Sequence, residues 1–193
     1  MTLPTLLQTN FRLPPAKAEE VAELFREDQL TKGEYFLRRG QTIRKLAFPQ
    51  NGYLRGWAPG GDKDITQWIF TPSYFVADLN ALFFGTPARW NIQALEDCRL
   101  WTLPEKNYLR VNTIVPNWET LEKQFLARCF MTLEDRVFGF LSLSARERYE
   151  ALLAFNPDLP EAVPLHYLAS MLGMTAETLS RVRREHSAGQ NGK

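Results

Sequence analysis

The sequence predicts an α+β protein in which an N-terminal antiparallel β sandwich or barrel is followed by a long helix and a C-terminal helix-turn-helix. Between residues 31 and 103, short runs of β-branched and aromatic residues alternate with Gly, Pro, Asn and Asp, as in antiparallel sheets. After Pro116, apolar residues recur with a heptad spacing that favours one long helix. Near the end of the chain, Gly173 separates two short amphipathic segments, a pattern typical of a helix-turn-helix.

The composition narrows the class of protein. The 193 residues are 45% hydrophobic and 12% aromatic, which is enough for a substantial core. With 23 basic and 22 acidic residues the net charge is +1, so a nucleic-acid partner needs a local cluster such as Arg181, Arg183 and Arg184. The only cysteines are Cys98 and Cys129, and the sequence shows neither a secretion signal nor an apolar run of about 20 residues. We therefore expect reduced thiols in a cytoplasmic protein that does not enter a membrane.

The individual elements follow from local patterns. Residues 15–30 are predicted to be a helix, because Val21, Leu24 and Phe25 are apolar with glutamates between them. Turn residues such as those at Lys32–Gly33 and 59–62 separate the predicted strands. These strands cover residues 35–37, 45–48, 53–57, 65–70, 90–94 and 99–103, and a short helix over 104–112 follows them.

The long helix is predicted to run from Pro116 to about Phe140. Its apolar residues follow a 4-3-4-3 spacing that we interpret as a dimer seam; the alternative is a helix packed only against its own barrel. A second apolar stripe would then face the barrel, at Leu121, Phe125 and Cys129. Ser144 and Glu147 form a capping-box pattern that begins another helix, which extends to Phe155. The seam residues are Leu126, Phe130, Leu133, Val137 and Phe140.

The pattern of the C-terminal segment predicts two packed helices, of which the second could enter the major groove of DNA. Leu165, Leu168, Ala169 and Leu172 share one face of a first helix, Thr175 caps a second helix, and Leu179 and Val182 point back towards the first. A glutamate can accept a hydrogen bond from cytosine, and an arginine can bind guanine. The residues left for DNA contacts are Thr175, Ala176, Glu177, Thr178, Ser180, Arg181, Arg183 and Arg184.

Two alternatives apply to this segment. It could be an ordinary packed helical hairpin, and Glu177 and Arg181 could simply pair with each other at i,i+4 spacing. We interpret Glu177 and Arg181 as base-reading residues, Thr175, Thr178 and Ser180 as phosphate contacts, and Arg183 and Arg184 as neutralising charges. After His186 the chain is polar, and we expect it to be flexible and to lack a β-hairpin wing.

The order of these elements resembles the Crp/Fnr superfamily of bacterial transcription regulators. The resemblance rests on Lys32–Glu34, Arg39–Gly40, Asn51–Gly56 and Thr175–Arg181, and Ser142–Tyr149 resembles a short-tailed branch of the superfamily. It implies a cyclic-nucleotide-binding-like jelly-roll barrel over residues 1–115, a dimerisation helix over 116–141 and a DNA-binding domain over 142–193. It also implies a homodimer on a two-fold symmetric site in double-stranded DNA, with RNA polymerase as a further partner.

In that family the barrel holds a phosphate-binding cassette, and here residues 75–94 depart from its pattern. Ala77 replaces a glycine, Asp78 replaces a glutamate, and Ala88 stands at the arginine position with Arg89 one place later. These departures argue against tight binding of cyclic AMP, so no cofactor is expected, although another small effector could bind. Asp78 and Arg89 could form an internal salt bridge or a modified ligand site. The candidate effector pocket is Ala77, Asp78, Leu79, Ala88, Arg89 and Trp90.

Two other functions compete with a DNA-binding regulator. A ligand-sensing or protein-interaction module that has lost DNA binding is favoured by the neutral charge, by Ala176 where relatives often have arginine, and by the missing wing. A barrel enzyme is not expected, because His166 and His186 lie outside the barrel and no metal-ligand or nucleophile pattern occurs. Two cysteines also cannot ligate an iron–sulfur cluster alone.

Overall fold

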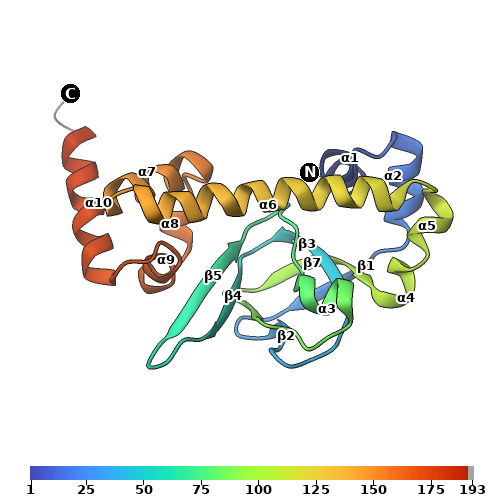
Figure 1. The fold of residues 1–193 in the computed structure, drawn as a ribbon, viewed down its shortest axis with the longest axis horizontal. Coiled ribbons are helices and arrows are strands. Elements are labelled where there is room, and N and C mark those ends of the chain that lie inside the picture. Colours follow the sequence, from blue (N-terminus) through green and yellow to red (C-terminus); the bar gives the residue numbers. More distant parts are fainter. Residues whose placement is uncertain (191–193) are drawn as a thin grey trace. The chain divides into compact units, whose positions relative to one another are not determined.

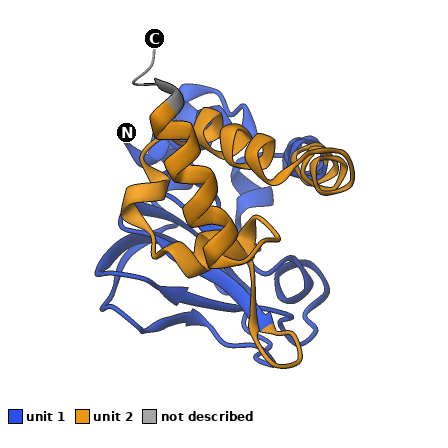
Figure 2. Cartoon of the chain, turned by 90° about the vertical axis from the view of Figure 1, so that its left-hand side faces the viewer, with its two compact units in different colours: residues 1–58, 69–130 blue, residues 59–68, 131–193 orange. Residues whose placement is uncertain are grey.

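The computed structural model describes residues 1–190, and they form two compact units (Figure 2). The first unit comprises residues 1–58 and 69–130, and the second comprises residues 59–68 together with the chain from Met131 onward. The long helix is therefore divided between the units at residues 130 and 131. The second unit also includes residues 59–68, which we call the hairpin tip because they comprise the turn between two neighbouring strands and the strand residues next to it.

The β-rich region consists of two sheets, as predicted, and the first strand pairs with the last, the second and fourth with the sixth, and the third with the last, all in antiparallel orientation (Figure 1). The three-stranded sheet has the order β1-β7-β3, and the four-stranded sheet has the order β2-β6-β4-β5. Two sheets of this kind bury side chains at alternate positions along each strand. The strands are β1 (Arg26–Leu30), β2 (Tyr35–Leu37), β3 (Lys45–Asn51), β4 (Leu54–Pro59), β5 (Asp64–Phe70), β6 (Asn91–Ala94) and β7 (Cys98–Pro104).

The prediction of one helix over residues 15–30 is wrong. Helix α1 spans Leu3–Phe11, α2 spans only Pro15–Ala22, and the chain then turns into β1. The turn is closed by hydrogen bonds from the Leu24 amide to the Val21 carbonyl and from the Phe25 amide to the Ala22 carbonyl, both 3.0 Å. Strand β1 pairs with β7 along its whole length. This tertiary pairing overrides the helical pattern of a polar segment.

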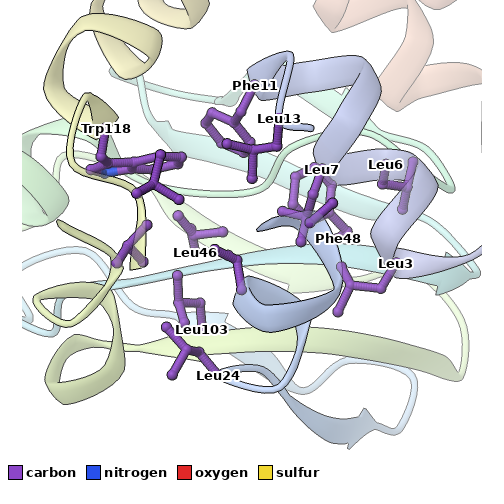
Figure 3. Packing of buried hydrophobic residues seen from close by; sticks show 14 of the residues in the cluster. Leu3, Leu6, Leu7, Phe11, Leu13, Leu24, Leu46, Phe48, Leu103 and Trp118 are labelled. Atoms are coloured by element: carbon purple, nitrogen blue, oxygen red, sulfur yellow. The ribbon is translucent and has the colours of Figure 1, made fainter. Parts of the chain in front are cut away.

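Helices α1 and α2 cover the outer residues of the three-stranded sheet. The Phe11 ring lies 4.7 Å from the Trp118 ring and 4.6 Å from the Phe125 ring, so the beginning of the long helix packs on α1 (Figure 3). Leu121 and Cys129 pack against the same core, which confirms the second apolar stripe as a packing face. Members of this core include Leu6, Leu7, Phe11, Leu46, Phe48, Leu103, Trp118 and Phe125.

The remaining helices follow the predicted order with two differences. The single helix expected over 104–112 is two short helices, and an unpredicted one-turn helix follows α7. The capping box of Ser144 and Glu147 is present at the start of α7. Among the described residues, no helix is long and apolar enough to cross a membrane. The helices are α3 (Leu79–Phe84), α4 (Glu105–Tyr108), α5 (Val111–Ile114), α6 (Trp118–Ser142), α7 (Ala145–Phe155), α8 (Leu159–Ala162), α9 (Leu165–Met171) and α10 (Ala176–Gln190).

Candidate nucleic-acid interface and effector site

Helices α9 and α10 form the predicted helix-turn-helix motif. Gly173 between them has a φ of 66°, the left-handed conformation that a glycine adopts without steric cost. The Thr175 side chain accepts a hydrogen bond of 3.1 Å from the Thr178 amide and so caps the start of α10. Leu168 and Leu179 are fully buried between the helices. This packing fixes which face of α10 turns outward.

The outward face of α10 carries Glu177, Arg181 and Arg184, all of which are exposed. The suggested pairing of Glu177 with Arg181 is not observed, because Arg181 Nε lies 3.9 Å from a carboxylate oxygen of Glu185, one turn further along. Both members of this i,i+4 pair are exposed, so solvent screens the interaction and the arginine can be released at little cost. Glu177 and Arg181 therefore remain on one exposed helical face.

The other predicted DNA-contacting residues are less available. Arg183 is half-buried and donates to the Pro160 carbonyl (3.3 Å) and to the Glu161 carboxylate (2.5 Å), both on α8. This arginine therefore holds α10 against α8 in the described chain. Ala176, Thr178 and Ser180 are partly exposed. Helix α10 extends to Gln190, whereas the sequence suggested a flexible chain after His186; residues 191–193 lie outside the described residues.

The hairpin tip contacts α9 through an interaction that sequence reasoning missed. The Arg136 guanidinium donates to the Gln67 carbonyl in the hairpin tip and, over 2.7 Å, to the Met171 carbonyl at the end of α9. It also lies 5.1 Å from the Trp68 ring centroid. Burial lowers the pKa of Arg136 to about 10. A second link is the hydrogen bond of 2.9 Å from the Thr66 amide to the Ser170 hydroxyl.

The predicted seam of α6 is only partly exposed. Phe130, Leu133 and Val137 are exposed, whereas Leu126 packs against the core of the first unit. Phe140 is also exposed, at 38%, although the Arg148 guanidinium lies 5.6 Å from its ring. Three further large apolar side chains are exposed on the same half of the helix, and we call the combined surface the α6 stripe. It comprises Phe130, Met131, Leu133, Val137, Phe138 and Leu141.

In the cassette, Asp78 is 2% exposed and its carboxylate accepts three backbone hydrogen bonds. Its Oδ1 caps α3 by accepting from the Ala81 amide (3.0 Å), and its Oδ2 accepts from the amides of Arg89 (2.8 Å) and Trp90 (3.1 Å). The structure therefore replaces the suggested salt bridge of Asp78 and Arg89 with backbone hydrogen bonds. The Arg89 side chain is exposed, 5.9 Å from the Trp90 ring.

The residues around Asp78 differ in their exposure, and the nearby amides are already occupied. Ala88 is buried, Ala77 and Trp90 are half-buried, and Leu79 is exposed. Two amides that point into the cassette already bind a carboxylate, so an incoming phosphate would compete with Asp78 for these donors. The hydrogen-bond donors of this site are therefore already paired with a carboxylate of the same chain.

Neither the histidines nor the cysteines form a reactive cluster. His166 is exposed beside the Tyr167 ring, and His186 Nδ1 lies 3.7 Å from the Glu150 carboxylate. Burial raises the pKa of the Cys98 thiol to about 11, which disfavours the reactive thiolate. In residues 1–190, no group of three His, Cys, Asp or Glu residues is placed to bind a metal ion.

Comparison with known proteins identifies the class of this fold. Residues 27–111 match the family model of the cyclic nucleotide-binding domain. A CooA mutant from Carboxydothermus hydrogenoformans is 21% identical with a TM-score of 0.66, over 88% of this chain and 79% of that chain. The Thermus thermophilus catabolite activator protein is 22% identical with a TM-score of 0.58, over 97% of this chain and 87% of that chain. No curated protein sequence matches the chain.

The name of a third similar structure includes a ligand. The c-di-GMP responsive global regulator CLP of Xanthomonas campestris is 15% identical with a TM-score of 0.67, over 92% of this chain and 93% of that chain. The comparisons therefore show that residues 27–111 match the model of the cyclic nucleotide-binding domain and that the fold of the chain is similar to that of these solved regulators. The predicted α+β fold is confirmed, and the resemblance to the Crp/Fnr superfamily is confirmed at the level of the fold.

Proposed function

We propose that this protein is a homodimeric, sequence-specific DNA-binding transcription regulator of the Crp/Fnr type. The observation that carries the proposal is the outward face of α10, where Glu177 and Arg181 are exposed on a helix held by a capped, packed turn. Both side chains have the chemistry to read base edges in the major groove. Arg184 is exposed on the same helix and suits a phosphate contact.

The α6 stripe supports a symmetric dimer. Val137 is 50%, Phe138 69% and Leu141 82% exposed, an apolar surface that a soluble monomer rarely leaves open. Pairing of α6 with α6 of a second copy would cover this surface, and two-fold symmetry would present two α10 helices to half-sites roughly 34–36 Å apart. In this proposal residues 1–115 sense the effector, 116–141 mediate dimerisation and 142–193 bind DNA in the cytoplasm, with RNA polymerase as a further partner.

The cassette supports a regulator that does not bind cyclic AMP tightly. The Asp78 carboxylate holds the Arg89 and Trp90 amides, and the Arg89 side chain points away from Asp78 to solvent. A cyclic phosphate would have to displace an intramolecular anion that needs no association entropy. The chain is accordingly proposed to act as a regulator without an enzymatic activity.

Selection of bound sequences from a random DNA pool, with and without cyclic AMP, tests this function. We expect a two-fold symmetric motif that does not depend on the nucleotide. The Arg181→Ala variant should lose about 1–3 kcal/mol of binding free energy and relax the preference at one position in each half-site.

The Arg184→Ala variant is the matched control, because it removes an exposed arginine from the same helix. We expect it to weaken binding evenly on all sequences and to reduce the salt dependence. If no motif is enriched, the protein is a ligand-sensing or interaction module without DNA binding. If Arg181→Ala behaves like Arg184→Ala, Arg181 contacts only phosphate.

A further inference from the structure

A second site lies in the first unit, on one face of the three-stranded sheet. The register places Arg26 of β1 and Ala47 of β3 opposite Thr102 of β7, and Lys45 lies two residues from Ala47. Side chains at directly opposed positions and at alternate positions along a strand share one face of a sheet. Arg26, Lys45 and Thr102 therefore meet on the same face, opposite to that of Leu46 and Leu103 in the core against the helices.

This face opens into a groove of about 680 Å³, a volume within the range of small-molecule sites. None of its residues belongs to the cassette around Asp78. Its lining combines four cationic side chains with one carboxylate, in a chain whose net charge is only +1. The lining is Arg26, Ile43, Arg44, Lys45, Thr102, Pro104, Glu105, Lys106 and Leu109.

The positive charge in the groove is incompletely balanced. Arg26 Nε lies 3.2 Å from the Asp28 carboxylate, and Arg44 Nε lies 3.8 Å from Glu105. The Lys45 ammonium lies 4.2 Å from the centroid of the buried Phe36 ring, and it forms no ion pair with any described residue. Burial lowers the pKa of Lys45, so an added negative charge here would relieve a desolvated cation.

Thr102 supplies the second, independent observation. This residue is 0% exposed and is among those that line the groove, and its hydroxyl has no hydrogen-bond partner within the described part of the chain. A buried hydroxyl without a partner is costly, and such a group in a native structure calls for an explanation. A ligand oxygen bound beside Lys45 would satisfy this hydroxyl.

The rim of the groove is apolar. Ile43 and Leu109 are both exposed although they are large aliphatic residues, and both line the groove. An inorganic ion would leave them uncovered, whereas the body of an organic ligand would cover them. Arg44 connects the groove to the cassette helix, because its guanidinium packs against Gly85 at the end of α3.

We propose that this groove binds an organic polyanion of nucleotide size, with its anionic group at Arg26, Lys45 and Thr102 and its apolar body on Ile43 and Leu109. The site is separate from the cyclic-nucleotide cassette, and the inference does not depend on DNA binding. Nucleoside polyphosphates have the required combination of several negative charges and an apolar ring system.

Calorimetric titration of the full chain with adenosine triphosphate, inorganic triphosphate and adenosine tests the proposal. We expect adenosine triphosphate to bind, inorganic triphosphate to bind more weakly and adenosine not to bind. Lys45→Met retains the contact with Phe36 but removes the charge, so it should weaken binding by about ten- to a hundredfold. Thr102→Val should weaken binding by about two- to tenfold without lowering the melting temperature, because it removes an unpaired buried hydroxyl.

Arg39→Met is the matched control, since Arg39 is an exposed cation of the same unit outside the groove. We expect it to change the affinity by less than about twofold, because solvent and salt screen a distant exposed charge. The proposal is overturned if Arg39→Met and Lys45→Met weaken binding equally, or if none of the probes binds. It is also overturned if cyclic AMP displaces the nucleotide and Asp78→Asn, but not Lys45→Met, changes the affinity.

Discussion

Asp78 determines the hydrogen bonding of the cassette, because its carboxylate accepts from three backbone amides. Its carboxylate caps α3 and binds two amides of the loop before β6, so one side chain fixes both ends of the segment over residues 78–90. The sequence placed Asp78 and Arg89 near each other correctly. It could not show which groups satisfy the carboxylate, because backbone amides carry no signature in the sequence.

We expect Asp78→Ala to lower the free energy of unfolding by about 2–3 kcal/mol, because it removes a helix cap and leaves three amides without their acceptor. Asp78→Asn keeps one acceptor oxygen and should lose less. Asp97→Ala is a suitable comparison, since that exposed carboxylate accepts the Lys32 amide over 2.8 Å. Urea unfolding of the three variants measures the differences. Equal stability of Asp78→Ala and Asp97→Ala would contradict this role for Asp78.

At the scale of elements, patterns along the chain predicted the six strands from β2 to β7 and the helix-turn-helix well. These segments carry their own signals: alternation, turn residues, the capping Thr175 and a helix-ending glycine. The sequence did not predict β1, a polar strand that exists because β7 pairs with it. It also missed the contact between Arg136 and the hairpin tip, since a charged residue on a helix is usually solvated.

Replacement of Arg136 tests that contact. We expect Arg136→Met to lower the free energy of unfolding of the second unit by about 2–3 kcal/mol, because the partly buried carbonyls of Gln67 and Met171 lose a charged donor. Hydrogen exchange should accelerate in the hairpin tip and in α9. Arg146→Met, which breaks an exposed pair with Glu150 on α7, should leave exchange in both segments unchanged. Unchanged protection in Arg136→Met would show that the hairpin tip is held by other groups.

At the scale of the whole molecule, the sequence predicted most of the exposed apolar residues of α6 but not all of them. The heptad pattern included Leu126, which packs against the core of the first unit, whereas the other four predicted seam residues are exposed. It omitted Met131, Phe138 and Leu141, which are exposed. A one-dimensional spacing cannot tell which of two neighbouring stripes the rest of the chain covers, because coverage depends on tertiary contacts.

The dimer can be tested at the centre of the α6 stripe. Val137→Lys should raise the dimer Kd by at least about a hundredfold, because two-fold symmetry buries the unpaired ammonium of both copies in the interface. Asp135→Lys introduces the same side chain at an exposed position outside the stripe and should leave the dimer intact. Sedimentation equilibrium measures both. A monomeric parent protein at micromolar concentration would refute the dimer and, with it, the symmetric DNA site.

The hairpin tip limits how this protein can be divided for experiments. Residues 59–68 belong to the second compact unit. They include parts of β4 and β5, and the other residues of these two strands belong to the first unit. A C-terminal fragment that begins at residue 142 would lack both Arg136 and Trp68, and it would leave the ring of Phe155 and the Met171 carbonyl uncovered. Such a fragment would be a poor substitute for the intact chain in DNA-binding work, and proteolysis at the hairpin tip should impair the helix-turn-helix from more than 70 residues away.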